Sequence, residues 1–388
     1  MLRGRPNWVE IDLDAVAHNV RELKRLIGDA DLLAVVKANA YGHGAPMVAR
    51  TALKNGAKWL GVARVDEGIQ LRRAGIKSPI LIIGYSTPSE AESIVKNQLT
   101  PTVNSKQFAL ALSAVSAAYN IACPIHIKVD TGLTRYGLLP DEIVDFAKGL
   151  NTLPNLRLEG LYTHFATSDE PDKGFVHQQF KVYRETLQRL TDEGIKITVR
   201  HAANSGAALD VPETRMDLVR CGITLYGLYP STDVSREAKL RPVLSFKSQV
   251  ARVREVPAGT TVSYGRTYKI DSTTRLALVP VGYADGLSRA LSNQGSVLIR
   301  GHRAPIVGRV CMDQCVVNVN EIPDVRVGDE VVIIGRQDGE EITADELAKQ
   351  LGTINYEITS SITARVPRVY LRRGRAVAAD TLLETTTF

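Results

Sequence analysis

The sequence has no run of about 18 or more apolar residues, which is the length that a membrane-spanning helix needs. Cysteine is scarce, with four in 388 residues, so a disulfide framework is not expected. Cys311 and Cys315 are four residues apart, but no second pair of Cys or His accompanies them. A zinc site is therefore not expected either. We interpret the four cysteines as buried thiols.

Aromatic residues make up only 6% of the chain, and Lys and Arg are scattered rather than clustered with them. The net charge of +6 therefore does not indicate nucleic-acid binding. A modest basic excess instead suits small anions such as phosphates and carboxylates. The N-terminus has no apolar signal core, so we expect a cytoplasmic protein without a metal cofactor. The length fits two domains.

The first part of the chain alternates short apolar runs with amphipathic stretches, which is typical of a parallel sheet covered by helices. Eight such units over this length predict an α/β fold with an N-terminal (β/α)8 TIM-like barrel, and a doubly wound sheet is the rival. The predicted strands are residues 32–37, 59–63, 80–83, 99–103, 125–130, 158–164, 197–201 and 218–226, and the predicted helices are 12–27, 45–56, 65–74, 105–119, 141–150 and 175–193.

The pattern changes after about residue 235, where short strand-like segments are separated by turn signals. They predict a C-terminal, mostly antiparallel β domain. We place the domains at 1–235 and 236–388, with residues 1–10 able to pack with the β domain, and 231–239 as a linker. The predicted strands are 243–256, 275–282, 296–300, 304–310, 315–319 and 329–334. The helix predicted at 343–351 has Thr343 as its N-cap.

Lys37 stands where the apolar run Leu32–Val36 gives way to loop residues. Lysine is rarely buried without a reason, and desolvation of an amine lowers its pKa and makes it a better nucleophile. The alternative is a lysine whose amine extends into solvent from the strand end. Both interpretations stay open on this feature alone.

Other polar residues follow the predicted strands at the same end. In a barrel the active site lies at the carboxyl ends of the strands, so these side chains are predicted to converge. They are Lys128, Asp130, His164, His201, Asn204, Ser205 and Arg220.

Together, the motifs of the chain resemble those of the alanine racemases, which use pyridoxal 5′-phosphate (PLP). The matching segments run in order through both predicted domains: Ala34–Gly44 (AVVKANAYGHG), Lys128–Gly132 (KVDTG), Arg135–Gly137 (RYG), Leu161–Thr167 (LYTHFAT), Ala203–Ser205 (ANS), Val219–Ile223 (VRCGI), Val262–Gly265 (VSYG), Val281–Gly286 (VGYADG), Gly308–Gln314 (GRVCMDQ), Ile354–Glu357 (INYE) and Arg365–Pro367 (RVP). The family fold, a barrel followed by a β domain, agrees with the pattern of predicted strands and helices.

The resemblance implies that Lys37 holds PLP covalently and acts as the base for D-alanine. Tyr264 would be the base on the opposite face, for L-alanine, because racemisation removes a proton on one face and returns it on the other. A free tyrosine ionises only at alkaline pH, and the resemblance supplies His164 and Arg220 as its helpers. Tyr264 would reach the barrel of a partner subunit, so a homodimer with shared active sites is implied.

The resemblance also assigns cofactor contacts. Arg220 would donate to the PLP pyridine nitrogen, and a guanidinium, which only donates, would leave that nitrogen unprotonated. The resulting weaker electron sink suits an enzyme that only moves one proton. The implied cofactor-binding residues are Lys37, Tyr41, Arg135, His164, Asn204, Ser205, Arg220, Gly222, Ile223 and Tyr356, with amides of Ser205, Gly222 and Ile223 on the phosphate.

For the substrate, the resemblance implies contacts from Arg135 and the Met312 amide, and an entry corridor lined by Asp169, Tyr283, Arg289, Arg309, Ile354 and Tyr356. Lys128 matches a lysine that is often carbamylated in the family and would then orient Arg135. A free Lys128 paired with Asp130 stays open. Thr134 and Tyr136 depart from the commoner residues beside Arg135, which leaves the substrate range open.

Three alternatives remain at this point. A PLP-dependent basic amino-acid decarboxylase would share the two-domain layout, but the chain lacks the glycine-rich phosphate run of those enzymes. A PLP-binding homeostasis protein would resemble the barrel alone. A serine or broad-specificity racemase of the same architecture is the strongest alternative, because specificity depends on the geometry of the corridor. The predicted activity is interconversion of L- and D-alanine, supplying D-alanine for peptidoglycan.

Overall fold

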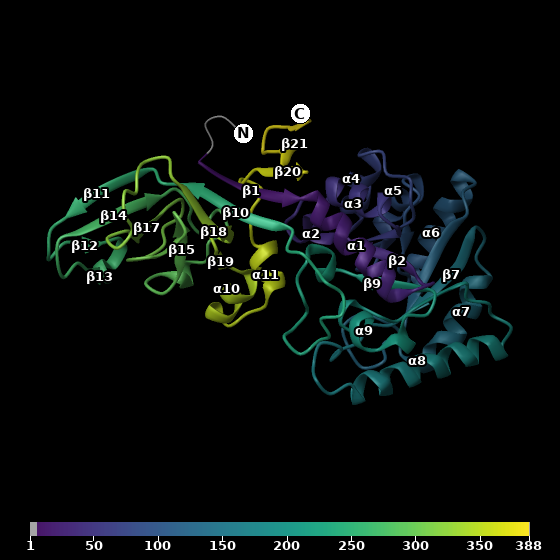
Figure 1. Cartoon of the computed structure of the whole chain (residues 1–388). Helices are drawn as coiled ribbons and strands as arrows, with labels where there is room; N and C mark the ends of the chain where they lie inside the picture. The colour runs from purple at the N-terminus through teal and green to yellow at the C-terminus, as the bar shows by residue number, and fades with distance from the viewer. Residues whose placement is uncertain (1–5, 388) are drawn as a thin grey trace. The chain divides into compact units, whose positions relative to one another are not determined.

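The computed structural model describes residues 6–387, which divide into two compact units. The barrel unit comprises Ala15–Ala40 and Ala45–Pro242. The β unit comprises the chain up to Asp14, the short segment Tyr41–Gly44, and the chain from Val243 on. Figure 1 shows the chain coloured from its N-terminus to its C-terminus, with many of the helices and strands labelled.

Within residues 6–387, the barrel unit has eight parallel strands that follow one another in chain order. One group pairs in the order β5-β4-β3-β2-β9 and the other in the order β6-β7-β8. A parallel bridge between Thr102 and His126 joins the groups on one side, and Arg220 N donates to Ala203 O (3.1 Å) on the other. The strands are β2 (Asp31–Val35), β3 (Ala57–Val62), β4 (Ile80–Ile82), β5 (Thr100–Pro101), β6 (Cys123–Lys128), β7 (Leu156–Tyr162), β8 (Val199–His201) and β9 (Leu218–Cys221). The predicted barrel is confirmed.

The helices of the barrel unit turn their apolar residues inward. In α1, Val16, Val20, Leu23 and Ile27 recur at helical spacing and are all buried. Ser105 caps α6 by accepting from Phe108 N (3.2 Å). The helices are α1 (Leu13–Ile27), α3 (Ala45–Lys54), α4 (Val65–Arg73), α5 (Ala91–Lys96), α6 (Lys106–Tyr119), α7 (Ile143–Asn151), α8 (Gly174–Asp192) and α9 (Ser205–Asp210); α2 (Lys37–Tyr41) is a special turn described below. Short 3-10 turns lie at Pro88–Glu90, Pro140–Glu142, Pro212–Thr214 and Ile223–Tyr226.

The β unit is built on a large mixed sheet of order β16-β15-β18-β10-β1-β20-β21-β22, with β19 paired to β18. Two smaller antiparallel sheets are β11-β14-β17 and β12-β13. In the large sheet, β1 pairs antiparallel with β10 and parallel with β20. The sequence patterns predict neither β1 nor β20–β22. The strands are β1 (Asn7–Asp12), β10 (Leu244–Gln249), β11 (Arg252–Val256), β12 (Thr261–Val262), β13 (Tyr268–Lys269), β14 (Thr274–Val279), β15 (Ser296–Ile299), β16 (His302–Pro305), β17 (Cys315–Asn318), β18 (Glu330–Gln337), β19 (Glu340–Ile342), β20 (Arg368–Arg372), β21 (Arg375–Asp380) and β22 (Thr385–Thr387).

Two helices complete the β unit, α10 (Ala344–Leu351) and α11 (Asn355–Ser360), with 3-10 turns at Tyr264–Arg266 and Arg289–Leu291. The predicted cap of α10 is present, since Thr343 Oγ1 accepts from Glu346 N (3.0 Å). A small apolar core of the β unit consists of Val256, Val262, Ile270, Leu276 and Val307.

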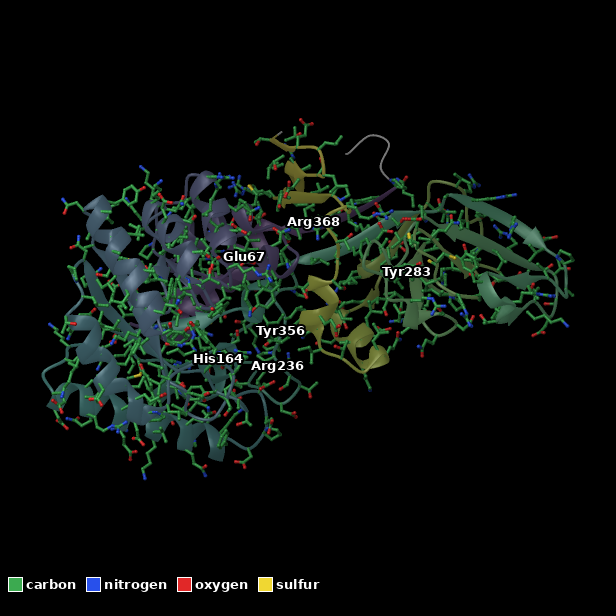
Figure 2. The ribbon with its side chains drawn as sticks, turned by 180° about the vertical axis from the view of Figure 1, so that it is seen from behind. Glu67, His164, Arg236, Tyr283, Tyr356 and Arg368 are labelled. Atoms are coloured by element: carbon green, nitrogen blue, oxygen red, sulfur yellow. The ribbon has the colours of Figure 1, made fainter. Side chains whose placement is uncertain are left out.

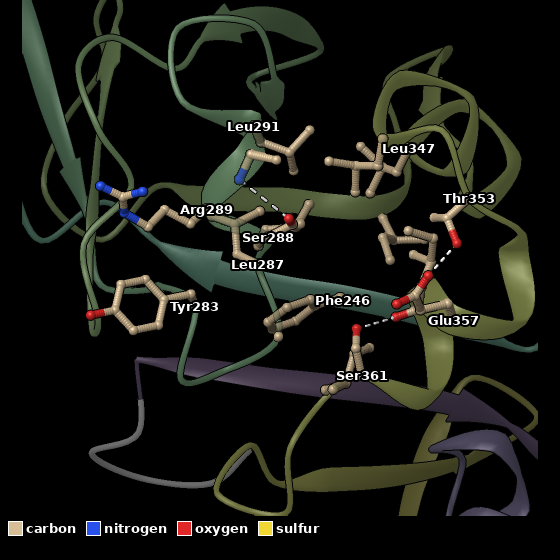
Figure 3. Close-up of a pocket in the computed structure, with 17 residues that line it drawn as sticks. Phe246, Tyr283, Leu287, Ser288, Arg289, Leu291, Leu347, Thr353, Glu357 and Ser361 are labelled. Atoms are coloured by element: carbon tan, nitrogen blue, oxygen red, sulfur yellow. Dashed lines mark hydrogen bonds between the residues drawn. The ribbon is translucent and has the colours of Figure 1, made fainter. Parts of the chain in front are cut away.

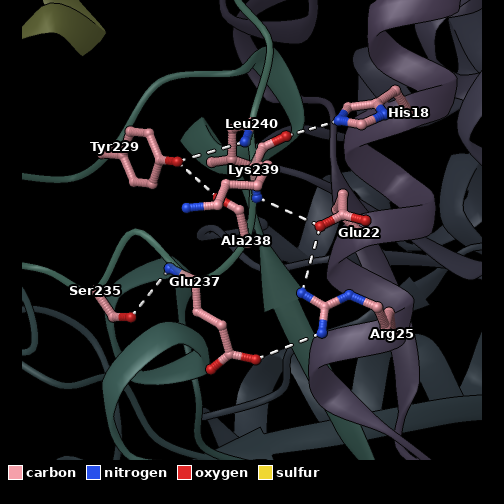
Figure 4. Close-up of polar contacts among 9 residues, drawn as sticks. All are labelled: His18, Glu22, Arg25, Tyr229, Ser235, Glu237, Ala238, Lys239 and Leu240. Carbon is pink, nitrogen blue, oxygen red and sulfur yellow. Dashed lines mark hydrogen bonds and ion pairs between the residues drawn. The ribbon is translucent and has the colours of Figure 1, made fainter.

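The segment expected to be a linker is fastened to the barrel unit by polar contacts with α1 (Figure 4). His18 Nε2 lies 2.6 Å from Lys239 O, and Glu22 Oε2 accepts from Lys239 N (3.3 Å). Arg25 pairs with Glu237 at 3.5 Å. The chain therefore stays with the barrel unit until Pro242.

Candidate active site

Lys37 follows directly on β2, whose last four residues are buried. Burial, followed by the nearby cation of Arg135, lowers the pKa of the Lys37 amine, and the carboxylate of Glu67 partly opposes this. A lowered pKa raises the fraction of neutral, nucleophilic amine near neutral pH. This environment favours the reactive-lysine interpretation of the strand end.

The backbone after Lys37 makes a left-handed turn. Ala38, Asn39, Ala40 and Tyr41 all have φ between 52° and 55°. For L-residues this conformation costs roughly 1–2 kcal/mol each, so consecutive examples need support from their surroundings. Part of that support is the Asn39 side chain, whose Oδ1 accepts from Ala45 N (2.9 Å).

Glu67 in α4 supplies further support and was not predicted from the sequence (labelled in Figure 2). Its Oε1 accepts from Ala38 N (2.6 Å), while Oε2 accepts from Ala63 N (2.7 Å) and Arg64 N (3.1 Å). From the sequence alone, an acidic residue in the first turn of a helix is predicted only to cap that helix. No local pattern predicts a contact with Ala38, which lies 29 positions earlier.

Arg220 in β9 is buried and held by the ends of the neighbouring strands. Its Nη1 donates to His201 O (3.0 Å) and contacts His201 Nδ1 (3.1 Å). Its Nη2 donates to Thr163 O (2.7 Å) and Ala202 O (2.8 Å), with His164 Nδ1 at 3.4 Å. Among the described residues none accepts from the Arg220 Nε–H. Burial lowers the pKa of the guanidinium to about 10, so it stays cationic at neutral pH.

His164 shares its surroundings with several cations. Burial, followed by the charges of Arg220, Lys128, Arg135 and Lys37 in that order, puts its pKa well below the ordinary value. His164 is therefore neutral at pH 7. The charges that act on it are all positive, so this end of the barrel is suited to an anionic ligand.

Lys128 ends β6 and is buried. Burial, then Arg135 and Arg220, lowers its pKa to about 8, against a smaller opposing effect of Asp130. Within residues 6–387, no ion pair joins Lys128 to Asp130. The Asp130 carboxylate instead accepts from Gly132 N and Thr134 N, both at 3.0 Å, and so shapes the loop that leads to Arg135.

The backbone amides that are candidates for phosphate binding lie in the segments that follow β8 and β9. Asn204 caps α9, with its Oδ1 accepting from Ala207 N (3.1 Å) and Ser168 Oγ (2.8 Å). Ser205 Oγ accepts from Gly222 N (3.0 Å), so this amide already has a protein partner. In the described part of the chain no acceptor meets the amides of Ser205 and Ile223. Asp169 lies in the loop after β7, where its carbonyl accepts from Ser231 Oγ (2.5 Å).

In the β unit, Tyr41 packs near Tyr356, with ring centroids 6.0 Å apart (Tyr356 is labelled in Figure 2). The segment after Tyr41 is clasped tightly: Arg368 Nε donates to Gly42 O (3.0 Å), and a Cβ on Gly42 would lie 2.2 Å from Thr359 O. Gly42 also has φ of +88°, which favours glycine. The residues from Tyr41 to Gly42 are thus fixed in position.

Tyr264 lies on a strained turn and is 72% exposed. Ser263 before it has φ 64° and ψ −173°, a region occupied almost only by glycine. The Ser263 hydroxyl donates to Arg309 O (2.6 Å) and contacts Cys311 Sγ (3.4 Å). The residue before Tyr264 is therefore strained, and Tyr264 itself is exposed to solvent.

Met312 and Tyr283 come from adjacent backbone segments of the β unit. Tyr283 N donates to Cys311 O (3.1 Å) and Ala284 N to Met312 O (2.9 Å). Tyr283 and Arg289 line a cavity of about 410 Å³, shown in Figure 3. Met312 and Ile354 are more than half exposed.

The structure thus collects the predicted residues within each unit. Lys37, Lys128, Arg135, His164 and Arg220 share one electrostatic environment in the barrel unit. Tyr264, Arg309, Met312 and Tyr283 lie on connected segments of the β unit. In the described residues no group of acidic, His or Cys side chains is arranged to hold a metal, and all four cysteines are free.

Comparison with known proteins identifies the family. The family model "Alanine racemase, N-terminal domain" matches residues 11–230, and "Alanine racemase, C-terminal domain" matches residues 243–370. The chain belongs to the alanine racemase family.

Relatives and solved structures of this family match almost the whole chain. An alanine racemase of Halothermothrix orenii is 47% identical over 94% of this chain and 97% of its own, and one of Desulfosudis oleivorans is 50% identical over 94% and 96%. The solved alanine racemase of Clostridium difficile has a TM-score of 0.95 at 40% identity, covering 98% of this chain and 100% of its own. That of Bacillus anthracis, with bound L-Ala-P, has a TM-score of 0.93 at 40% identity and covers 98% of each chain. No helix in the described part of the chain is long and apolar enough to span a membrane.

Proposed function

We propose that this chain interconverts L- and D-alanine with PLP, by moving one proton on and off the substrate Cα. Its relatives over nearly the full length are alanine racemases, which favours alanine over the serine or broad-specificity alternative. The match to both domain models argues against a protein built from the barrel alone. The role proposed for the product is supply of D-alanine for peptidoglycan.

The residues of the barrel unit fit PLP. Lys37 offers an amine of lowered pKa to its aldehyde, and the surrounding cations suit its phosphate and phenolic oxygen. Arg220 has one donor, Nε–H, left over for an acceptor such as a pyridine nitrogen. The amides of Ser205 and Ile223 are proposed to hold the phosphate.

When bound, PLP withdraws electrons from the Cα of the amino acid that it carries and makes the Cα–H acidic. With alanine bound, the Lys37 amine is proposed to take or return the proton on one face of Cα. Its lowered pKa suits this work near neutral pH. Arg220 stays cationic and donates only, so it limits how strongly electrons are withdrawn and restricts the chemistry to proton movement.

Tyr264 is proposed as the acid or base on the opposite face, supplied to the barrel of a second copy of the chain. The supporting observation is that Tyr264 is 72% exposed and lies on a strained turn of the β unit. Strained residues concentrate where function needs them, and a large exposed aromatic side chain suits an interface. Met312 is exposed on a connected segment, and in the described residues no acceptor meets its amide, which suits the substrate carboxylate. Arg135 is proposed as the second carboxylate contact.

Proton exchange at Cα is the observation that tests this function. The PLP-loaded protein is incubated with L-alanine in heavy water. The two enantiomers are then separated, and the deuterium content of each is measured by mass spectrometry. D-alanine carrying deuterium at Cα is the expected product. Deuterated L-alanine without the D-form would mean a single working base and would refute the role of Tyr264. Unchanged, unlabelled L-alanine would refute the proposed activity, and parallel incubations with serine would test the alternative substrate.

A further inference from the structure

The position of Arg135 depends on the loop that carries it. Within residues 6–387, no hydrogen bond or ion pair holds its guanidinium. Its charge nevertheless acts on Lys37, Lys128 and His164. The side chain is therefore placed by the backbone of the Arg135 loop, which we define as residues 129–138, directly after β6.

The Arg135 loop is closed at its base by backbone contacts. Asp130 N donates to Leu138 O (2.8 Å), and Leu138 N donates to Lys128 O (3.0 Å). The Asp130 carboxylate shapes the loop from within by accepting from two of its amides. These contacts determine the form of the loop, but they do not connect it to the loop that carries His164.

Gln179 of α8 makes that connection. The His164 loop comprises residues 163–173, between β7 and α8 (His164 is labelled in Figure 2). Gln179 is fully buried. Its Oε1 accepts from Ala166 N (2.9 Å), and its Nε2 donates to His164 O (3.3 Å) and Thr131 Oγ1 (3.2 Å). One side chain thus contacts both loops.

The partners of Gln179 leave only one orientation for its amide. A backbone N–H can only donate, so the side-chain oxygen must face Ala166. The NH2 group then faces the carbonyl of His164 and the hydroxyl of Thr131. The oxygen and both hydrogens of the amide are therefore used, as a fully buried glutamine requires.

The direction of donation continues through two threonines. Thr163 Oγ1 donates its only proton to Val129 O (3.1 Å). The Thr131 hydroxyl, 2.7 Å away, must therefore donate to Thr163, and it accepts from Gln179. Thr163 belongs to the His164 loop and Val129 to the Arg135 loop. The hydroxyl of Thr131 is thus the point at which the two loops and α8 meet.

The same helix contacts the Arg135 loop a second time. A Cβ on Gly132 would lie 2.8 Å from Cζ of Phe175, so this ring lies directly against the glycine. Gly132 also has φ of +132°, which favours glycine. Phe175 lies in α8 one turn before Gln179, on the same face of the helix. A packing contact and a hydrogen bond from α8 therefore act on adjacent residues of the loop.

We propose that Gln179 is a positioning residue that holds the Arg135 loop against the His164 loop, and so places Arg135 for the substrate carboxylate. It acts through Thr131 and the loop backbone, and it is assigned no contact with PLP or alanine. This inference rests on the proposed function for the role of Arg135. The attachment of the two loops to α8 does not depend on that function.

The first test measures hydrogen exchange in protein without PLP, with peptides that cover residues 131–138 and 164–170. Thr131→Val removes the hydroxyl that joins the loops and leaves the other contacts of Gln179 in place. We expect amide exchange to rise about tenfold in 131–138, the effect of one or two lost hydrogen bonds. In 164–170 it should change less than about twofold, because Gln179 still holds that loop.

Gln179→Met replaces the amide by a side chain of similar length without a strong hydrogen-bonding group. It removes the contacts with Ala166 and His164 as well as the contact with Thr131. Exchange should therefore rise in both peptides, by about tenfold. Should this variant fail to fold, the comparison of the two peptides in Thr131→Val decides the question alone.

Two variants serve as controls. Thr131→Ser keeps the hydroxyl and should exchange within about twofold of wild type. Thr186→Val removes a hydrogen bond from Thr186 Oγ1 to Val182 O (2.8 Å), about two turns beyond Gln179 in α8, and should not loosen residues 131–138 selectively. Unchanged exchange of 131–138 in Thr131→Val would refute the attachment. A rise of equal size in both its peptides, or the same pattern in Thr186→Val, would indicate general loosening and refute it too.

The second test asks whether the attachment acts on Arg135. A contact that substrate and transition state share affects KM more than kcat. Thr131→Val should therefore raise the KM for alanine about fivefold and keep kcat within about twofold of wild type, and Thr131→Ser should restore both values. Unchanged KM in a Thr131→Val protein with raised exchange would refute the positioning of Arg135. A wild type that does not racemise alanine would instead refute the proposed function, and the exchange results would still decide the attachment.

Discussion

The carboxylate of Glu67 accepts a hydrogen bond of 2.6 Å from the amide of Ala38, the residue that follows Lys37. The same carboxylate accepts from the amides of Ala63 and Arg64. One side chain thus caps the start of α4 and holds the first residue of a left-handed turn. This turn fixes the direction in which the chain leaves Lys37.

We therefore expect Glu67→Ala to lower the free energy of unfolding by about 2–3 kcal/mol, since hydrogen bonds to a charged acceptor contribute about 1.5–3 kcal/mol. Glu67→Gln, which keeps one acceptor oxygen, should lose about half as much. Urea denaturation of both variants measures this. An alanine variant as stable as wild type would show that the turn is held by other contacts.

Lys37→Ala should abolish the yellow, borohydride-reducible form of the PLP-incubated protein. The reason is that burial and Arg135 give this amine a lowered pKa and hence a nucleophilic fraction that an exposed lysine lacks. Lys58→Ala, at an exposed position of β3, is the matched control and should remain yellow. Visible absorbance and the mass of the reduced peptide are the measurements. A yellow, reducible Lys37→Ala protein would mean that another lysine holds PLP.

Mixing Lys37→Ala with Tyr264→Phe should restore activity that neither variant has alone. If each active site takes Lys37 from one subunit and Tyr264 from another, random exchange makes half of the dimers hybrid, with one intact site of two. The expected activity is about a quarter of wild type. Racemisation is followed after subunit exchange has been verified with differently tagged chains. Absence of recovery in verified hybrids would place both residues in one subunit's site.

The barrel was predictable from the sequence because its strands are buried on both faces and read as short apolar runs. Leu32–Val36 is an example, since each of its residues is buried. The β unit was predicted less completely. β1 and β20 pair although they are more than 350 residues apart in sequence, and no local pattern indicates such a pairing.

For the candidate site, motifs located the residues but not their partners. The left-handed turn after Lys37 uses Ala, Asn, Ala and Tyr, which only tertiary contacts can hold in that conformation. Pairing of Lys128 with Asp130, left open by the sequence, is not made, because Asp130 binds two loop amides.

Lys128 should titrate with a pKa of about 8, lowered from 10.5. Its folded pKa is depressed, so between about pH 8 and 10.5 the unfolded chain holds more protons, and stability must rise with pH across this window. Relative to Lys128→Met, wild type should therefore gain on the order of 3 kcal/mol from below pH 8 to above 10.5. Urea denaturation in CO2-free buffer at several pH values measures the difference. A difference that does not vary with pH would contradict the lowered pKa.

The same pKa predicts carbamylation. Carbon dioxide reacts with a neutral amine, so at pH 8 about half of Lys128 is reactive, against a small fraction of an exposed lysine. Bicarbonate should therefore stabilise wild type near pH 8 and leave Lys128→Met unchanged. ¹³C NMR with labelled bicarbonate detects the adduct directly. Equal labelling of wild type and Lys128→Met would assign the adduct to another amine.

Ser263 combines two opposing contributions that substitution can separate. Its hydroxyl donates to Arg309 O (2.6 Å), while its φ of 64° and ψ of −173° cost roughly 1–3 kcal/mol for a residue other than glycine. Ser263→Ala loses the hydrogen bond and keeps the strain, so it should unfold about 1 kcal/mol more easily than wild type. Ser263→Gly loses both and should be more stable than Ser263→Ala by about 1 kcal/mol or more.

The kcat of Ser263→Gly should nevertheless fall, because a relaxed turn no longer holds Tyr264 in one position. Stability from urea denaturation and kcat in both directions are compared for the pair. Were Ser263→Gly to retain full kcat, the strain would serve no purpose in presenting Tyr264.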